Sequence, residues 1–94
     1  MQWYVYIIRA SDDSLYTGIT TDVERRFREH SGEGQGKDKR AKFFRGREPV
    51  EVVHVEKHPD RSSALKREAA IKGLDREQKV ELVKAGLKPP RRPC

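Results

Sequence analysis

The chain has 94 residues, which fits one compact domain and leaves little room for a second core. Lys and Arg number 21 against 15 Asp and Glu, so the net charge of +6 favours a polyanion as partner; the alternative is a basic protein whose charge serves only solubility. The longest apolar run, residues 3–8, is shorter than the ~20 residues that span a bilayer, and no signal-peptide pattern precedes it, so we expect no membrane contact and a cytoplasmic location.

A hairpin is predicted at the start of the chain. In residues 3–8 both the odd-numbered and the even-numbered residues are aromatic or β-branched. This is typical of a strand that is covered on both faces, so we place residues 3–8 at the centre of the sheet. Residues 11–14 are turn formers, and residues 15–20 return as the second arm.

A helix is predicted directly after the hairpin. Residues 21–24, Thr-Asp-Val-Glu, have the form of a capping box in which Glu24 reaches back to the Thr21 amide, and the helix runs to about residues 29–30. Val23 and Phe27 supply its apolar side. Its three arginines, Arg25, Arg26 and Arg28, cannot all point away from that side, so at least one borders the sheet.

The second half of the chain predicts one more strand and two helices. Residues 50–56 alternate as an edge strand, residues 61–72 are helical, and a last helix is capped by Asp75 with Gln78 and ends before Gly86. We therefore expect a single α+β domain over residues 1–86, with a three-stranded antiparallel sheet, strand 3–8 in its centre, flanked by three helices. Residues 87–94 form a basic Pro/Arg tail.

Glu68 lies where a core residue belongs. At ~100° per residue it falls within the apolar stripe of the predicted helix, beside Ala64 and Ile71. A buried carboxylate without a partner is strongly unfavourable, so Glu68 needs a cation, a metal or hydrogen bonds. Two interpretations stay open: a structural ion pair, for instance with an arginine of the first helix, and a metal-binding or catalytic carboxylate.

Tyrosines gather on the predicted hairpin. Tyr4 and Tyr6 share a face, and Tyr16 joins them only in a register that pairs even with even residues, such as Ala10 opposite Tyr16. Gly18, on the face of Tyr16, leaves a gap that would admit a ligand backbone or only mark a bulge. Aromatic core packing is the ordinary explanation of such tyrosines, and chemistry is the alternative.

Residues 37–47 form a basic segment that we expect to bind nucleic-acid phosphates, with Phe43 and Phe44 available to stack on an unpaired base. The alternative is a solvated loop with its phenylalanines in the core, where we expect at least one of them. His54 and His58 have no partners at zinc-like spacing and are interpreted as ordinary residues. The six cations of the segment are Lys37, Lys39, Arg40, Lys42, Arg45 and Arg47.

Five positions together resemble the GIY-YIG nuclease superfamily. Tyr6 closes a first triad, residues 4–6; the second triad, residues 16–18, begins ten residues after Tyr6, and Arg26, His30 and a helical Glu68 follow. The match covers roughly residues 3–84 and is closest to the small stand-alone bacterial type related to the cleavage domain of the excinuclease C subunit. The chain departs from some relatives in having Ile19 where they have lysine, and in containing no Asn.

The resemblance implies a metal-dependent phosphodiesterase. Tyr6 and Tyr16 would be the phenols, one of which helps to deprotonate the attacking water, while Arg26 would stabilise the transition state and His30 would act as acid/base or phosphate ligand. Glu68 would hold a divalent cation, Mg²⁺ or Mn²⁺.

We therefore expect an endonuclease that acts on DNA and is directed by structure rather than by sequence, because a single small domain has no second unit to read bases. RNA as substrate and a homodimer stay open. The alternative is a non-catalytic nucleic-acid-binding module of the same fold.

Overall fold

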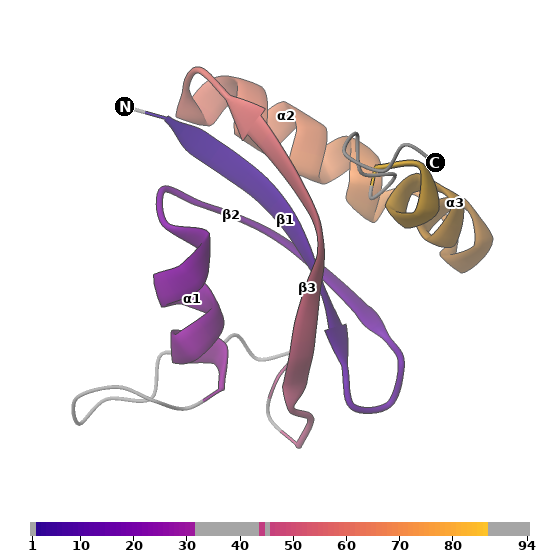
Figure 1. Cartoon of the computed structure of the whole chain (residues 1–94). Coiled ribbons are helices and arrows are strands. Elements are labelled where there is room, and N and C mark those ends of the chain that lie inside the picture. The colour runs from indigo at the N-terminus through magenta and orange to yellow at the C-terminus, as the bar shows by residue number, and fades with distance from the viewer. Residues whose placement is uncertain (1, 32–43, 45, 87–94) are drawn as a thin grey trace, which may run out of the picture.

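The structure is a three-stranded antiparallel sheet with helices on both faces (Figure 1). A computed structural model describes residues 2–31, 44 and 46–86. The elements are β1 (Trp3–Ala10), β2 (Leu15–Thr20), α1 (Val23–His30), β3 (Pro49–His58), α2 (Arg61–Lys72) and α3 (Arg76–Gly86). The strand order β2-β1-β3 confirms the α+β class, the central first strand and the edge position of the third. No helix in the described part of the chain is long and apolar enough to cross a membrane.

The central strand β1 is buried on both faces, as its composition predicted. Val5 and Ile7 point to one face and Tyr6 and Ile8 to the other, and all four are at most 1% exposed. Because side chains alternate along a strand, the two sets build two separate core layers.

Each layer is closed by different helices. Val5, Ile7 and Val53 pack against Ala64 and Ile71 of α2, with Leu82 and Val83 of α3 beside them. Tyr6, Ile8, Ala10 and Phe44 form the opposite layer with Val23 and Phe27 of α1. Helix α1 therefore covers one face of the sheet, and α2 and α3 cover the other (Figure 1).

The hairpin register brings the tyrosines to one face. Ile8 pairs with Tyr16 and Tyr6 pairs with Gly18, which confirms that even residues oppose even residues. The pairing of Ala10 with Tyr16 is wrong, because the turn closes earlier in the chain: the Ala10 amide donates to the Ser14 carbonyl at 2.9 Å. Asp13 accepts the left-handed conformation that this tight turn needs, with φ of 68°.

The helix caps follow the sequence except at α1. There Asp22, not Thr21, is the N-cap, and its carboxylate accepts from the Arg25 amide at 3.0 Å. The Thr20 hydroxyl accepts from the Asp22 amide at 3.1 Å, so the expected box from Thr21 to Glu24 is wrong by one residue. Asp75 and Gln78 form the reciprocal box expected for α3, whose last residue is Gly86 rather than a residue before it.

Replacing the cap of α1 should separate the two capping schemes. We expect Asp22→Ala to lower the free energy of unfolding by about 1 kcal/mol, because it leaves the Arg25 amide without its acceptor. Thr21→Ala should change it by less than about 0.5 kcal/mol. Urea unfolding of both variants measures this, and a larger loss for Thr21→Ala would contradict the observed cap.

Candidate active site

A buried hydrogen bond joins the hairpin to the end of α1. The Tyr6 hydroxyl and His30 Nε2 share a hydrogen bond of 3.0 Å, although the residues are 24 positions apart. The exposed fraction is 1% for Tyr6 and 0% for His30. Because the residues come from β1 and from the last turn of α1, the bond also fixes the helix on the sheet.

Aromatic rings surround this bond. Tyr16, which is half-buried, meets the His30 ring edge-on with centroids 5.2 Å apart, and its ring lies 6.2 Å from that of Tyr6. Phe44 is fully buried and packs 4.6 Å from His30 and 5.1 Å from Tyr16. The expectation that one phenylalanine of the basic segment belongs to the core is thus confirmed for Phe44, while Phe43 lies outside the described residues.

Gly18 makes room for the Tyr6 ring. A Cβ on Gly18 would lie 2.5 Å from the Tyr6 hydroxyl oxygen, 2.8 Å from Cζ and 3.0 Å from the Tyr16 ring. The gap on the sheet surface is therefore filled by a side chain of the protein, and it is neither open to a ligand backbone nor a bulge in β2. Glycine at this position lets the Tyr6 phenol pack closely against the backbone of the neighbouring strand.

Arg26 is the arginine of α1 that borders the sheet. Its Nη1 donates to Glu29 Oε1 at 2.9 Å, and its side chain is 27% exposed. The guanidinium also interacts with the Tyr6 hydroxyl, which contributes to the pKa of Arg26. Burial by itself would lower the pKa of Arg26, but Glu29 and Tyr6 together raise it, so the guanidinium stays charged at neutral pH.

Burial keeps the two hydrogen-bonded groups neutral. Burial and the neighbouring Tyr16 raise the pKa of Tyr6 well above its usual value, against the opposing effect of Arg26. Burial and the charge of Arg26 lower the pKa of His30 to about 4, with Glu29 opposing. At neutral pH the cluster therefore holds a protonated phenol, an uncharged imidazole and a cation.

Glu68 lies on α2, across the sheet from the phenols. Its side chain is 18% exposed and pairs with Lys72 Nζ at 3.3 Å, so the structural partner is a lysine of the same helix rather than an arginine of α1. Ala64 and Ile71 face the sheet, and Arg67 reaches Glu56 on β3. At ~100° per residue, Glu68 occupies the opposite flank of α2, toward β2.

Glu68 and Tyr16 therefore lie on opposite faces of the sheet. β2 is an edge strand, and Tyr16 lies on its far face. Among the described residues no group of three or more His, Cys, Asp or Glu could hold a metal ion. The donor set fits Mg²⁺ only as an ion that keeps most of its waters and shares substrate phosphate oxygens with one carboxylate.

The basic segment is described only at its end. Lys37, Lys39, Arg40, Lys42 and Arg45 lie outside the described residues. Arg47 Nε donates to Asp12 Oδ2 at 2.9 Å, which ties the segment to the hairpin turn. The hydrogen bonds of Asp12 with Arg47 and Ser14 hold its pKa well below the usual value.

A second polar cluster joins β3 to α2 on the face away from the phenols. Arg67 donates twice to Glu56, with Nε to Oε1 at 2.9 Å and Nη2 to Oε2 at 3.0 Å. The Nε2 atoms of His54 and His58 lie 2.9 and 3.3 Å from the same carboxylate. Burial opposes ionisation of Glu56, but these hydrogen bonds lower its pKa to about 2. The spacing of 54, 56 and 58 on one strand face was the available signal for this cluster.

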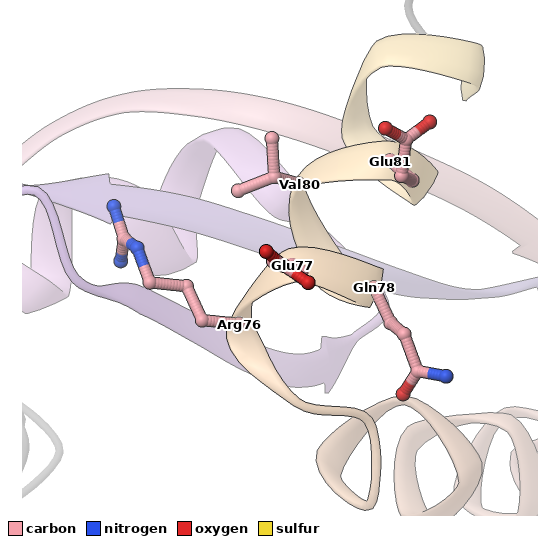
Figure 2. A pocket seen from close by; sticks show the side chains of 5 residues that line it. All are labelled: Arg76, Glu77, Gln78, Val80 and Glu81. Carbon is pink, nitrogen blue, oxygen red and sulfur yellow. The ribbon is translucent and has the colours of Figure 1, made fainter.

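The described residues also line surface hollows outside the aromatic cluster. One, of about 500 Å³, is lined by the exposed side of α3, and Figure 2 shows its side chains leaving one helix in different directions. Another, of about 610 Å³, lies between α1 and β3 on the phenol face. Valines and Phe27 make it apolar, and Glu24 and Glu51 on its border disfavour a phosphate there. Neither gathers catalytic groups.

Comparison with known proteins identifies this arrangement. Residues 2–81 match the family model described as the GIY-YIG catalytic domain. The chain is 56% identical over 83 residues to the UPF0213 protein HQ_3675A of Haloquadratum walsbyi, with 88% of each chain covered. The chain belongs to the GIY-YIG family.

Other relatives of this GIY-YIG domain are similar in length. The UPF0213 protein YhbQ of Escherichia coli is 46% identical over 85 residues, which cover 89% of this chain and 79% of YhbQ. The solution NMR structure of the UPF0213 protein BH0048 from Bacillus halodurans has a TM-score of 0.59 at 41% identity and covers 95% of this chain and 89% of its own. The GIY-YIG domain indicates the endonuclease superfamily.

In this GIY-YIG domain the structure gathers Tyr6, Tyr16, Arg26 and His30 and leaves Glu68 on the other side of β2. Sequence reasoning missed Glu29, the acceptor of Arg26. Its spacing of three residues from Arg26 on a predicted helix was the available signal.

The contact between Gly18 and Tyr6 predicts a local overpacking effect. We expect Gly18→Ala to lower the free energy of unfolding by about 1–3 kcal/mol, because the added methyl must displace the Tyr6 ring. Gly73→Ala is the matched control, since its Cβ would meet its nearest neighbour at 3.5 Å in an ordinary helical conformation. Equal stabilities of the two variants in urea unfolding would contradict the close packing.

The depressed pKa of His30 predicts a loss of stability in mild acid. The unfolded chain takes up this proton near pH 6.5 and the folded chain only near pH 4, so stability falls as pH decreases between these values. The loss from pH 7 to pH 5 should approach about 2 kcal/mol. Glu56 contributes only at lower pH, where its own pKa lies.

Two measurements check this. NMR titration of the His30 ring should find it uncharged at pH 5, and urea unfolding should lose its dependence on pH between 7 and 5 in His30→Gln. A His30 ring that titrates near pH 6.5 in the folded protein would refute the prediction.

Proposed function

We propose that this chain is a metal-dependent endonuclease that hydrolyses phosphodiester bonds of DNA. The convergence of two phenols, a charged guanidinium and a neutral imidazole on one sheet face, within a GIY-YIG domain, is the observation that supports it. The single small domain has no second unit to read bases, which favours a substrate selected by its structure over one selected by its sequence.

Tyr6 and Tyr16 differ in burial, so we assign them different roles. Tyr6 is enclosed, and its raised pKa keeps it protonated, so it positions groups rather than removing a proton. Tyr16 is half-buried and can reach solvent and substrate. We therefore assign to Tyr16 the contact with the attacking water, and to Tyr6 the orientation of His30 and Arg26 through its hydroxyl.

The remaining groups act on the phosphate and the proton. Arg26 remains charged and is suited to the negative charge that develops on the phosphate oxygens. His30 is uncharged at neutral pH, and its place beside Tyr16 suits it to accept a proton or to bind phosphate. Glu68 would hold Mg²⁺ or Mn²⁺, which when bound supplies charge stabilisation and lowers the pKa of a coordinated water.

The test is cleavage of labelled branched, nicked and plain duplexes in Mg²⁺, Mn²⁺ or EDTA. We expect cleavage that needs the metal, and a loss of at least about 100-fold in Tyr16→Phe, Arg26→Ala and Glu68→Gln. Glu77→Gln, an exposed carboxylate of α3, is the control and should cleave normally.

Two results would contradict this proposal. Absence of cleavage on every duplex with every metal, together with salt-sensitive binding, would replace the enzyme by a nucleic-acid-binding module. Cleavage that survives Glu68→Gln would remove Glu68 as the metal ligand.

A further inference from the structure

Glu29 lies three residues after Arg26 on α1 and forms ion pairs with Arg25 and Arg26. Its Oε1 accepts from Arg26 Nη1 at 2.9 Å, and its Oε2 lies 3.9 Å from Arg25 Nε. The Glu29 side chain is only 19% exposed, whereas Arg25 is 56% exposed. The short, partly enclosed contact is therefore the one with Arg26.

This contact restricts a side chain that is otherwise flexible. An arginine side chain has many rotamers, so a guanidinium beside a buried phenol needs a partner that selects one of them. Residues three apart on a helix are neighbours, which lets Glu29 reach Arg26 without any change of the backbone. The carboxylate takes Nη1, while the guanidinium keeps its interaction with the Tyr6 hydroxyl.

Glu29 also balances the charge around the imidazole. Arg26 lowers the pKa of His30, and Glu29 raises it. Glu29 therefore both binds the Arg26 guanidinium and offsets part of its effect on the imidazole.

We propose that Glu29 is a positioning residue of the active site, which fixes the Arg26 guanidinium beside Tyr6 so that it can contact a phosphate. The inference rests on the proposed nuclease function. Glu29 acts through Arg26 and does not itself touch the substrate.

Kinetics of matched variants test this role. In Glu29→Ala we expect kcat to fall by about 10–100-fold with KM changed less than about 3-fold, because a misplaced arginine loses transition-state contacts. Glu29→Gln keeps an acceptor oxygen and should recover part of the loss. Glu24→Ala removes the same charge from the same helix, and Glu24 makes no ion pair with any described residue, so it should cleave normally.

A double substitution distinguishes positioning from a general effect. In an Arg26→Ala background, Glu29→Ala should cause no further loss of kcat, because its partner is already absent. An additional loss as large as that in the native background would overturn the proposal.

Side-chain NMR decides the question without any cleavage assay. The Arg26 Nε–Hε group should be rigid in the native chain and in Glu24→Ala and become mobile in Glu29→Ala. An Arg26 side chain that stays rigid without Glu29 would refute its positioning role. If the native chain cleaves nothing, the nuclease function fails by itself, and these spectra still decide whether Glu29 holds Arg26.

Discussion

The packing of one buried phenol on one glycine determines the geometry of the active-site face. Tyr6 lies over Gly18 of the neighbouring strand, and its hydroxyl bonds to His30 at the end of α1. A side chain at position 18 would push the ring away, and a shorter side chain at position 6 would leave the imidazole without this partner. The same contact therefore specifies the pairing of β1 with β2 and the placement of α1.

One face of the sheet mainly stabilises the domain, and the other also contains the candidate active-site groups. Ala64 and Ile71 of α2 close an aliphatic layer, and the Glu56–Arg67 pair ties the same helix to β3. The phenol face combines packing with polar groups, so its buried polar atoms need partners inside the protein. Separating these tasks allows the aliphatic layer to stabilise the domain, while the phenol face holds groups whose protonation differs from that in water.

The electrostatics of the phenol face depend on burial more than on opposing charges. Tyr6 and His30 are neutral because they are enclosed, and Arg26, which is charged like any guanidinium at neutral pH, has Glu29 as its partner at 2.9 Å. An enclosed cation with a satisfied partner can act on an incoming phosphate with little reorganisation. Glu68 is held apart on α2 beside Lys72, so any site that uses it has to be completed by the substrate and by bound water.

The sequence by itself determined the elements whose signals are local. The aromatic and β-branched run in residues 3–8, the turn formers that precede residues 15–20, the Asp75–Gln78 box and the apolar stripe of α2 each lie within a few neighbouring residues, and each appears in the structure. The candidate phenols, Arg26, His30 and Glu68 were also found from the sequence through a family resemblance. Tertiary structure alone decided that Tyr16 opposes Ile8 and that Glu68 lies on the opposite side of the sheet from the phenols. These outcomes depend on hydrogen bonds and packing between residues that only the folded chain brings together, and a single sequence contains no local pattern that records such contacts.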